Sequence, residues 1–293
     1  MATATSLRGS PKLPSPGPRL REVLPHGTAQ CPGCGRRTAA ARYEDVLRVC
    51  TGCGFHARVP ARARTVQLAD PGTCMPIALD PGMRDPLGFD DGVPYRRRLA
   101  EAREATGLPD VFALARCEIA GAPAIVAAMD FAFLGGSLGS AAGSAFLRAC
   151  DAAVDERRSL VAVCVSGGAR MQEGIVALAQ MARCSAGTSA LARAGLPYVS
   201  VLGDPCFGGV TASFATQADV ILAEPGARIG FAGGRVIQQA THQQLPDGFQ
   251  TAEFLASRGM IDRVVHRAEL PALIGRLLTA FTSAGPGDGA PGR

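Results

Sequence analysis

Short apolar runs alternate with alanine-rich segments of helical periodicity over the second half of the chain. A continuous apolar run of about 4–8 residues, bounded by turn residues, is typical of a strand buried on both faces. The alternation predicts strand–helix–strand crossovers and therefore an α/β fold with a largely parallel sheet. The expected strands are residues 124–131, 160–166, 198–202 and 219–224, and the expected helices are residues 140–158, 174–195 and 209–218.

The first half of the chain has a different texture. Residues 1–25 are rich in Pro, Ser and Gly, and we expect a disordered tail there. Residues 26–60 contain paired cysteines. Residues 61–110 are expected to be a linker that mixes Pro-Gly turns with one exposed, charged helix over residues 95–106. We expect the α/β core over residues 111–280 and a second disordered tail over residues 281–293.

Composition restricts the class of protein. With 293 residues, of which 47% are hydrophobic, the chain can bury a sizeable core, which excludes a wholly disordered protein. The N-terminus lacks the apolar segment of a secretory signal, and the longest uncharged stretch, residues 131–147, is too rich in Gly and Ser for a membrane span. The sequence therefore predicts a cytoplasmic protein without a membrane partner, in which thiols stay reduced.

Charge separates the two halves. Residues 1–66 carry eleven basic and three acidic side chains, a net charge of +8, whereas the remainder carries 19 basic and 22 acidic ones, a net charge of −3. A basic head on a mildly acidic body indicates two modules. The head could bind an anionic partner such as a nucleic acid, or it could simply be a solvated surface.

Four of the ten cysteines form two C-x2-C pairs, Cys31/Cys34 and Cys50/Cys53, separated by 15 residues. This spacing is typical of a four-cysteine zinc ribbon, in which thiolates occupy all four tetrahedral positions of Zn²⁺. We therefore expect a structural zinc that cannot activate water. A redox dithiol needs only one pair, and His56, which follows the second pair, would have no vacancy to fill.

The other six cysteines are scattered singly, and we interpret them as small buried hydrophobic residues. Cys206 is the exception, because it lies beside one of two glycine pairs. These pairs, Gly167-Gly168 and Gly208-Gly209, stand where expected strands hand over to helices. Such turns expose backbone N–H groups that can stabilise an oxyanion or enolate, although a tight turn alone would also require glycine.

Other catalytic motifs are weaker. The segment 135–139, GGSLG, matches a nucleophile elbow, with Ser137 as nucleophile and His242 or His266 as base. No phosphate-binding GxxxxGK[ST] loop is present, and the one GxGxxG pattern, residues 287–292, precedes no helix. A nucleotide-binding fold is therefore not indicated.

Long motifs in a fixed order then identify a family resemblance. They are the ribbon CPGC…CTGCGFHARVPARAR, DPLGF (85–89), YRRRLAEAREATGL (95–108), MDFAFLGGSLGSAAG (129–143), SGGARMQEG (166–174), GDPCFGGVTASFA (203–215), AEPGARIGFAGGRVI (223–237), LPDGFQTAEFL (245–255) and GMIDRVVHR (259–267). Over residues 28–275 the chain resembles the β subunit of the bacterial acetyl-coenzyme A carboxylase carboxyltransferase. The GGSLG segment lies inside one of these motifs, so the resemblance accounts for it without a nucleophile elbow.

The resemblance implies a crotonase (ClpP-like) core with an N-terminal four-cysteine zinc ribbon. The implied reaction moves a carboxyl group from carboxybiotin, supplied on a carrier protein, to a coenzyme A thioester, acetyl-CoA, giving malonyl-CoA. The implied partners are a carboxyltransferase α subunit in an α2β2 heterotetramer, a biotin carboxyl carrier protein and biotin carboxylase. In the family the active site lies between the α and β subunits. This chain, with its single core, would therefore supply half of it.

The resemblance also implies roles for individual residues. Gly208 and Gly209 are expected to form one oxyanion site, with Gly167 and Gly168 as the next candidates. Further candidate substrate-binding residues are Gly135 and Gly136 in another active-site loop, and Arg170 and Arg235, each of which could meet a coenzyme A phosphate or the partner interface. Glu173 could instead pair with Arg170 in a structural ion pair.

One departure from the family pattern concerns Cys206 and Phe207, which stand where members generally carry small hydroxylated residues. Larger side chains beside the oxyanion site could change the acyl group accepted. A pathway-specific acyl-CoA carboxyltransferase, a decarboxylase-type relative and a zinc-ribbon nucleic-acid-binding regulator therefore remain as alternatives.

Overall fold

The computed structural model describes residues 23–24, 27–82 and 85–283. The segments expected to be disordered tails lie mostly outside these residues. The terminal helix α9 (Leu270–Ser283) includes residues 281–283, and Val23–Leu24 forms strand β1 of the ribbon. At these two ends the modules therefore extend slightly further than the sequence predicts.

The core is one sheet with the strand order β11-β9-β8-β7-β6-β5-β4. Its parallel part consists of β6 (Ala122–Met129), β7 (Ser159–Ser166), β8 (Tyr198–Phe207), β9 (Val220–Ala223) and β11 (Arg263–Val264). Four of these are the predicted strands. The short strand β10 (Ile229–Gly230) pairs with the end of β8, so that Ile229 lies opposite Cys206.

Two antiparallel strands extend the sheet where none was expected. Strand β5 (Phe112–Ile119) pairs along its whole length with β6, and β4 (Met75–Ile77) pairs with β5. The helix α2 (Ala61–Leu68) packs on β5 and β6 and also contacts α9. The segment expected to be a linker is therefore part of the core.

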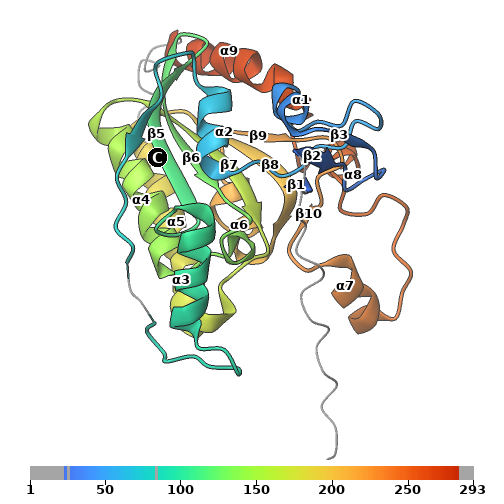
Figure 1. Cartoon of the computed structure of the whole chain (residues 1–293). Coiled ribbons are helices and arrows are strands. Elements are labelled where there is room, and N and C mark those ends of the chain that lie inside the picture. Colours follow the sequence, from blue (N-terminus) through green and yellow to red (C-terminus); the bar gives the residue numbers. More distant parts are fainter. Residues whose placement is uncertain (1–22, 25–26, 83–84, 284–293) are drawn as a thin grey trace, which may run out of the picture.

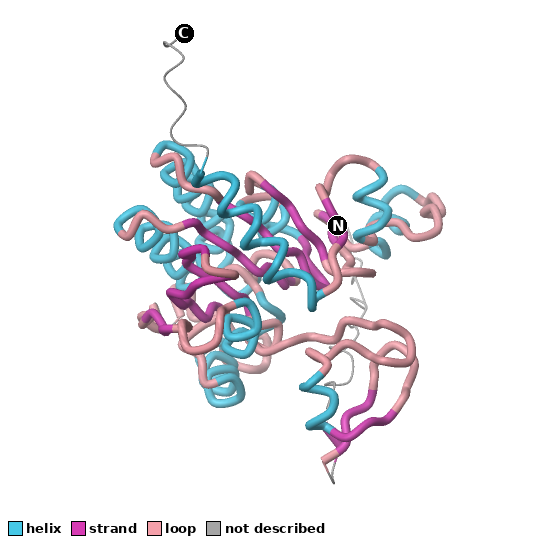
Figure 2. The backbone as a smooth tube through the Cα atoms, turned by 90° about the horizontal axis from the view of Figure 1, so that it is seen from above, coloured by secondary structure: helices cyan, strands magenta, loops and turns pink. Residues whose placement is uncertain are grey.

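The predicted crossover helices are present. Helix α4 (Ser140–Asp155) packs on β5, β6 and β7, and α5 (Gly174–Arg193) packs against α4. The third crossover is broken into α6 (Gly208–Thr211) and the 3₁₀ turn η3 (Phe214–Thr216). Figure 2 shows the strands running between helices, which bury the central strands as their apolar sequences require.

Smaller elements complete the architecture. They are α3 (Tyr95–Thr106), which has the predicted bounds, the 3₁₀ turns η1 (Leu134–Gly136), η2 (Met171–Glu173) and η4 (Arg267–Glu269), α7 (Gly234–Thr241) and α8 (Ala252–Ser257). Although α3 is charged, it buries Tyr95, Leu99 and Ala102. Helix α7 buries none of its residues and projects from the main body (Figure 1).

The ribbon is a small separate layer beside the core (Figure 1). It contains the antiparallel sheet β1-β2-β3, with β2 (Thr28–Gln30) and β3 (Arg37–Ala39), followed by α1 (Ala40–Asp45). Its own apolar cluster is only Ala29, Tyr43 and Ala57, with Val46 and Phe55 against it. A cluster of this size contributes little stability by itself, and small modules of this kind commonly add a structural metal.

No helix in the described ranges is long and apolar enough to cross a lipid bilayer.

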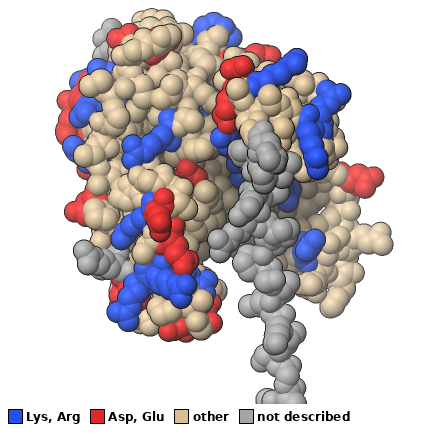
Figure 3. Space-filling view, viewed as in Figure 1, with Lys and Arg blue, Asp and Glu red and all other residues tan. Residues whose placement is uncertain are grey.

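Basic side chains gather over the ribbon and over α3 (Figure 3). On the ribbon, Arg36, Arg37 and Arg42 are exposed.

Candidate active site and metal centre

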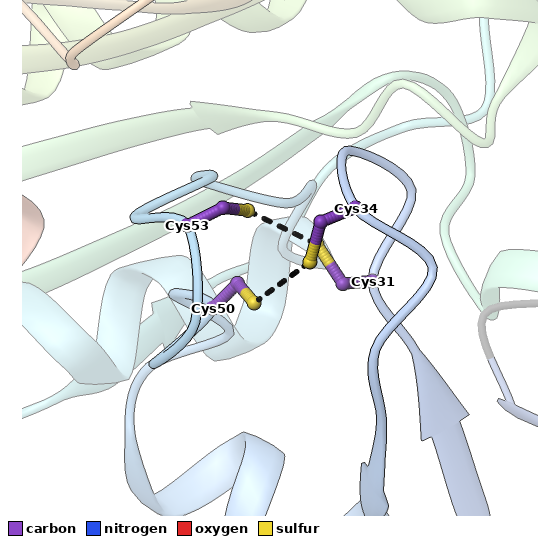
Figure 4. A group of neighbouring side chains, drawn as sticks. All are labelled: Cys31, Cys34, Cys50 and Cys53. Atoms are coloured by element: carbon purple, nitrogen blue, oxygen red, sulfur yellow. Dashed lines mark hydrogen bonds between the residues drawn. The ribbon is translucent and has the colours of Figure 1, made fainter.

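The four ribbon cysteines converge on one point (Figure 4). In each pair a glycine with a left-handed φ, Gly35 at 73° and Gly54 at 72°, turns the chain back, and its N–H donates to the carbonyl of the first cysteine. The sulfurs of Cys31 and Cys53 lie 3.7 Å apart, as do those of Cys34 and Cys50, and all four lie within 4.8 Å of one another.

These distances fit a tetrahedral zinc site. Metal–sulfur bonds of about 2.3 Å give a tetrahedron whose sulfur–sulfur edges are about 3.8 Å long. The cluster contains no fifth donor in the described structure, because the His56 ring is engaged elsewhere. His56 Nε2 accepts the N–H of Arg267 and Nδ1 faces the Gly54 carbonyl. The four cysteines can therefore hold a metal such as zinc.

We expect Cys31→Ser to abolish stoichiometric metal binding and to unfold the ribbon, because a serine hydroxyl is not a thiolate ligand. Elemental analysis of the purified protein should fall from one metal ion per chain to none. Cys74→Ser is the matched control, since Cys74 lies outside the cluster. Retention of one zinc per chain in Cys31→Ser would contradict this assignment.

A buried carboxylate joins the ribbon to the core. Glu224, at the end of β9, pairs with Arg64 from α2 and accepts hydrogen bonds from Arg267 at 2.8 and 2.5 Å. Arg267 also donates to the carbonyl of Leu47 in the ribbon at 2.7 Å. Burial alone would raise the pKa of Glu224, but the two guanidinium groups lower it to about 2, so the carboxylate stays charged.

The two glycine pairs meet. A Cβ atom placed on Gly208, whose φ is +61°, would lie 2.9 Å from the Cα of Gly168, and one placed on Gly168 would lie 3.7 Å from the Gly209 nitrogen. The turn after β7 and the turn after β8 are therefore in van der Waals contact. Their glycines are required for this close approach.

Most of the N–H groups expected to act as donors are already engaged. Gly167 donates to the carbonyl of Gly135 at 2.8 Å, Gly168 to Ser166 Oγ at 2.9 Å, and Gly208 to the carbonyl of Phe231 at 2.9 Å. These three glycines shape the site, but their N–H groups are not free to receive a substrate oxygen.

Two N–H groups beside them are unpaired in the part of the chain described: that of Gly209, which was among the expected donors, and that of Ala169, which was not. Within the described ranges, the backbone nitrogen of Ala169 has no hydrogen-bond acceptor, and neither has that of Gly209, which lies in the first turn of α6 without a capping side chain. A Cβ atom on Gly208 would lie 3.9 Å from the Ala169 nitrogen, so both donors border the same glycine contact. Sequence reasoning missed Ala169, because an alanine after a glycine pair carries no signal that its N–H is unpaired.

A buried polar network fixes the first glycine turn. Arg170 is only 1% exposed and donates to both oxygens of Asp110 at 2.7 Å and to Tyr95 and Ser137. Tyr95 in turn donates to Glu173 at 2.6 Å, and burial raises the pKa of Tyr95, so the hydroxyl keeps its proton. Arg170 is thus enclosed in a structural network and does not reach the surface to meet a phosphate.

Gly135 and Gly136 lie in the adjoining loop, pinned by the Gly135–Gly167 hydrogen bond. Ser137 in that loop accepts a hydrogen bond from Arg170 Nε at 3.1 Å. His242 is exposed at the end of α7, and His266 caps η4 and packs on His56 at a ring distance of 4.7 Å. In the part of the chain described, neither histidine bonds Ser137, whose hydroxyl is bound by Arg170, so the structure does not assemble the triad.

The remaining candidates lie in different surroundings. Cys206 is fully buried, its sulfur lies 3.4 Å from Thr211 Oγ1, and burial raises its pKa to about 12. Its side chain is therefore packed into the core and does not line a pocket, whereas Phe207 is half-buried. Arg235 is exposed on α7. Among the other single cysteines, Cys117, Cys150, Cys164 and Cys184 are buried as expected and Cys74 is half-buried.

Comparison with known proteins places this architecture. Residues 85–261 match the family model described as the carboxyl transferase domain. The chain is 48% identical, over 91% of its length and 92% of the relative, to the acetyl-coenzyme A carboxylase carboxyl transferase subunit beta of Thermus thermophilus. It is 49% identical, over 86% of its length and 44% of the relative, to a chain from Salinispora tropica named as subunits beta/alpha.

Solved structures agree. A malonate decarboxylase hetero-tetramer from Pseudomonas, in complex with malonate, contains a chain that is 27% identical, with a TM-score of 0.61 over 77% of this chain and 82% of that chain. Transcarboxylase 12S is 24% identical, with a TM-score of 0.64 over 82% of this chain and 43% of that one, which supports the fold. The chain therefore belongs to the carboxyl transferase family, among the β subunits of acetyl-coenzyme A carboxylase carboxyl transferase.

Proposed function

We propose that this chain is the β subunit of a carboxyltransferase that moves a carboxyl group from carboxybiotin, carried on a protein, to acetyl-CoA, giving malonyl-CoA. Relatives that match nearly the whole chain are named acetyl-coenzyme A carboxylase carboxyl transferase subunit beta. The single structural observation that supports the chemistry best is the contact between the two glycine turns, with the unpaired N–H groups of Ala169 and Gly209 beside it.

The reaction demands stabilisation of an enolate. Loss of CO₂ from carboxybiotin leaves a biotin anion that can take a proton from the thioester methyl group, and the resulting carbanion then attacks CO₂. Negative charge accumulates on the thioester oxygen meanwhile. Backbone N–H groups held in place before reaction stabilise that charge without a titrating side chain. We assign this role to Gly209 and Ala169, in place of the expected Gly208, Gly167 and Gly168.

Zinc, when bound by the four cysteines, would supply structural cross-linking of the ribbon. Because all four positions would be thiolates, the zinc would have no open coordination site and would take no direct part in carboxyl transfer. The exposed arginines of the ribbon remain available for an anionic partner, and nucleic-acid binding by the ribbon stays a prediction. The cytoplasmic location also stays a prediction.

The partner surface is indicated by exposed apolar residues near the glycine turns. Met171, Ile175 and Leu178 are 65%, 72% and 52% exposed, and their spacing places them on one face of the segment from η2 into α5. Exposed Ala179, Ala182 and Ala186 continue the same face along the helix. Such a stripe marks a protein interface, and we propose that a carboxyltransferase α subunit covers it in an α2β2 assembly served by biotin carboxylase and its carrier.

Carboxyl transfer tests this proposal directly. We expect the purified chain alone to form little malonyl-CoA from acetyl-CoA and carboxybiotin, and the complex with an α subunit to form it readily. Ile175→Arg should bind the α subunit poorly, because it places a charge in the apolar stripe. Val66→Arg is the control, since Val66 is 62% exposed on α2. Robust turnover by the chain alone, or none by the complex, would refute the proposal.

A further inference from the structure

Arg58 lies where the ribbon passes into the core. It follows Ala57, a member of the ribbon's small apolar cluster. Its carbonyl accepts a hydrogen bond from Arg48 Nη1 at 3.2 Å, and Arg48 is itself paired with Glu44 of α1. The backbone of Arg58 is therefore positioned by the ribbon.

The side chain of Arg58 reaches the core in two places. Its Nε donates to the carbonyl of Asp204 at 3.3 Å, and its guanidinium carbon lies 3.7 Å from the centroid of the Phe131 ring. One planar group thus makes a hydrogen bond and a stacking contact at once, a combination that arginine provides and lysine does not.

Both contacts lie just before active-site turns. Asp204 precedes Gly208 by four residues along β8, and Phe131 precedes Gly135 by four residues. The other side of Asp204 is held by Arg228, whose Nε donates to the Asp204 carboxylate at 2.8 Å and whose carbonyl accepts the N–H of Cys206. Arg58 and Arg228 therefore hold the segment leading to Gly208 and Gly209 from two separate parts of the chain.

We propose that Arg58 is a positioning residue for carboxyl transfer, which couples the folded ribbon to the turns at Gly135 and Gly208. The inference rests on the proposed function for its kinetic consequence, but not for its structural one. It gives the ribbon a role in the reaction: when the ribbon is folded, Arg58 holds the two turns in a fixed position relative to each other.

The test compares Arg58→Lys and Phe131→Leu with wild type in the complex with the α subunit. We expect kcat to fall about 10-fold with KM for acetyl-CoA unchanged, less than the roughly 10²-fold that a displacement of about 1 Å costs. Phe131→Tyr keeps the aromatic face and should retain wild-type kcat. Arg62→Ala is the matched control, because Arg62 donates to the carbonyl of Gly107, away from both turns.

Amide hydrogen exchange gives a second readout that does not depend on activity. The N–H groups of Gly167 and Gly208, which donate to Gly135 and Phe231, should exchange at least several-fold faster in Arg58→Lys, with the central strands unchanged. Unchanged exchange at both positions, or a uniform increase over the whole sheet, would overturn the inference. If the wild-type complex makes no malonyl-CoA, the proposed function fails while the exchange result still decides the role of Arg58.

Discussion

Replacing Arg170 by methionine is expected to lower the free energy of unfolding by about 3–5 kcal/mol, because it leaves charged groups buried without their partner. Asp110 would lose a two-pronged ion pair with both distances at 2.7 Å. The loop at Ser137 would lose two hydrogen bonds from the same guanidinium group. Urea unfolding of the metal-loaded chain measures the change.

Two further variants separate charge burial from loss of volume. Adding Asp110→Leu to Arg170→Met removes the stranded carboxylate and should restore part of the lost stability, since apolar pairs can replace buried ion pairs. Arg97→Met should change stability by no more than about 0.5 kcal/mol, because Arg97 and its partner Glu101 are both more than half exposed. An equal loss in Arg97→Met and Arg170→Met would contradict the role of the network.

The sequence predicts the parallel part of the sheet because strands buried on both faces are written as unbroken apolar runs. Strand β5 was missed, since Arg116 and Glu118 interrupt its apolar residues. Helix α2 was missed because it contains Arg62 and Arg64 and is preceded by Pro60, which offers no capping side chain. Its buried Arg64 is compatible with the core only because Glu224, 160 residues away, neutralises it.

The candidate site was predicted at the level of turns but not of atoms. Spacing alone was enough to predict that the four cysteines lie together, because a two-residue gap lets both sulfurs of a pair reach the same tetrahedral metal ion. The glycine pairs located the turns, but the acceptors of Gly167 and Gly208 come from Gly135 and Phe231, which only the folded chain brings near. Likewise, the pattern around Cys206 could not show which side of β8 its side chain occupies.

Gly208→Ala is expected to reduce kcat of the complex by about 10²-fold. The added Cβ atom would lie 2.9 Å from the Cα of Gly168, a backbone atom that cannot rotate away. The two turns must therefore separate, which displaces the N–H groups of Gly209 and Ala169 from each other. A misplacement of about 1 Å at such donors costs about this factor in rate.

Gly195→Ala isolates the effect of the contact from the effect of backbone strain. Gly195 has a φ of +64°, close to the +61° of Gly208, but no atom lies within 4 Å of the position of its added Cβ. Both variants should therefore lose about 1–2 kcal/mol of stability from the left-handed conformation, whereas only Gly208→Ala should lose activity. If the two variants show the same kcat, the close approach of the glycine turns is not what positions the donors.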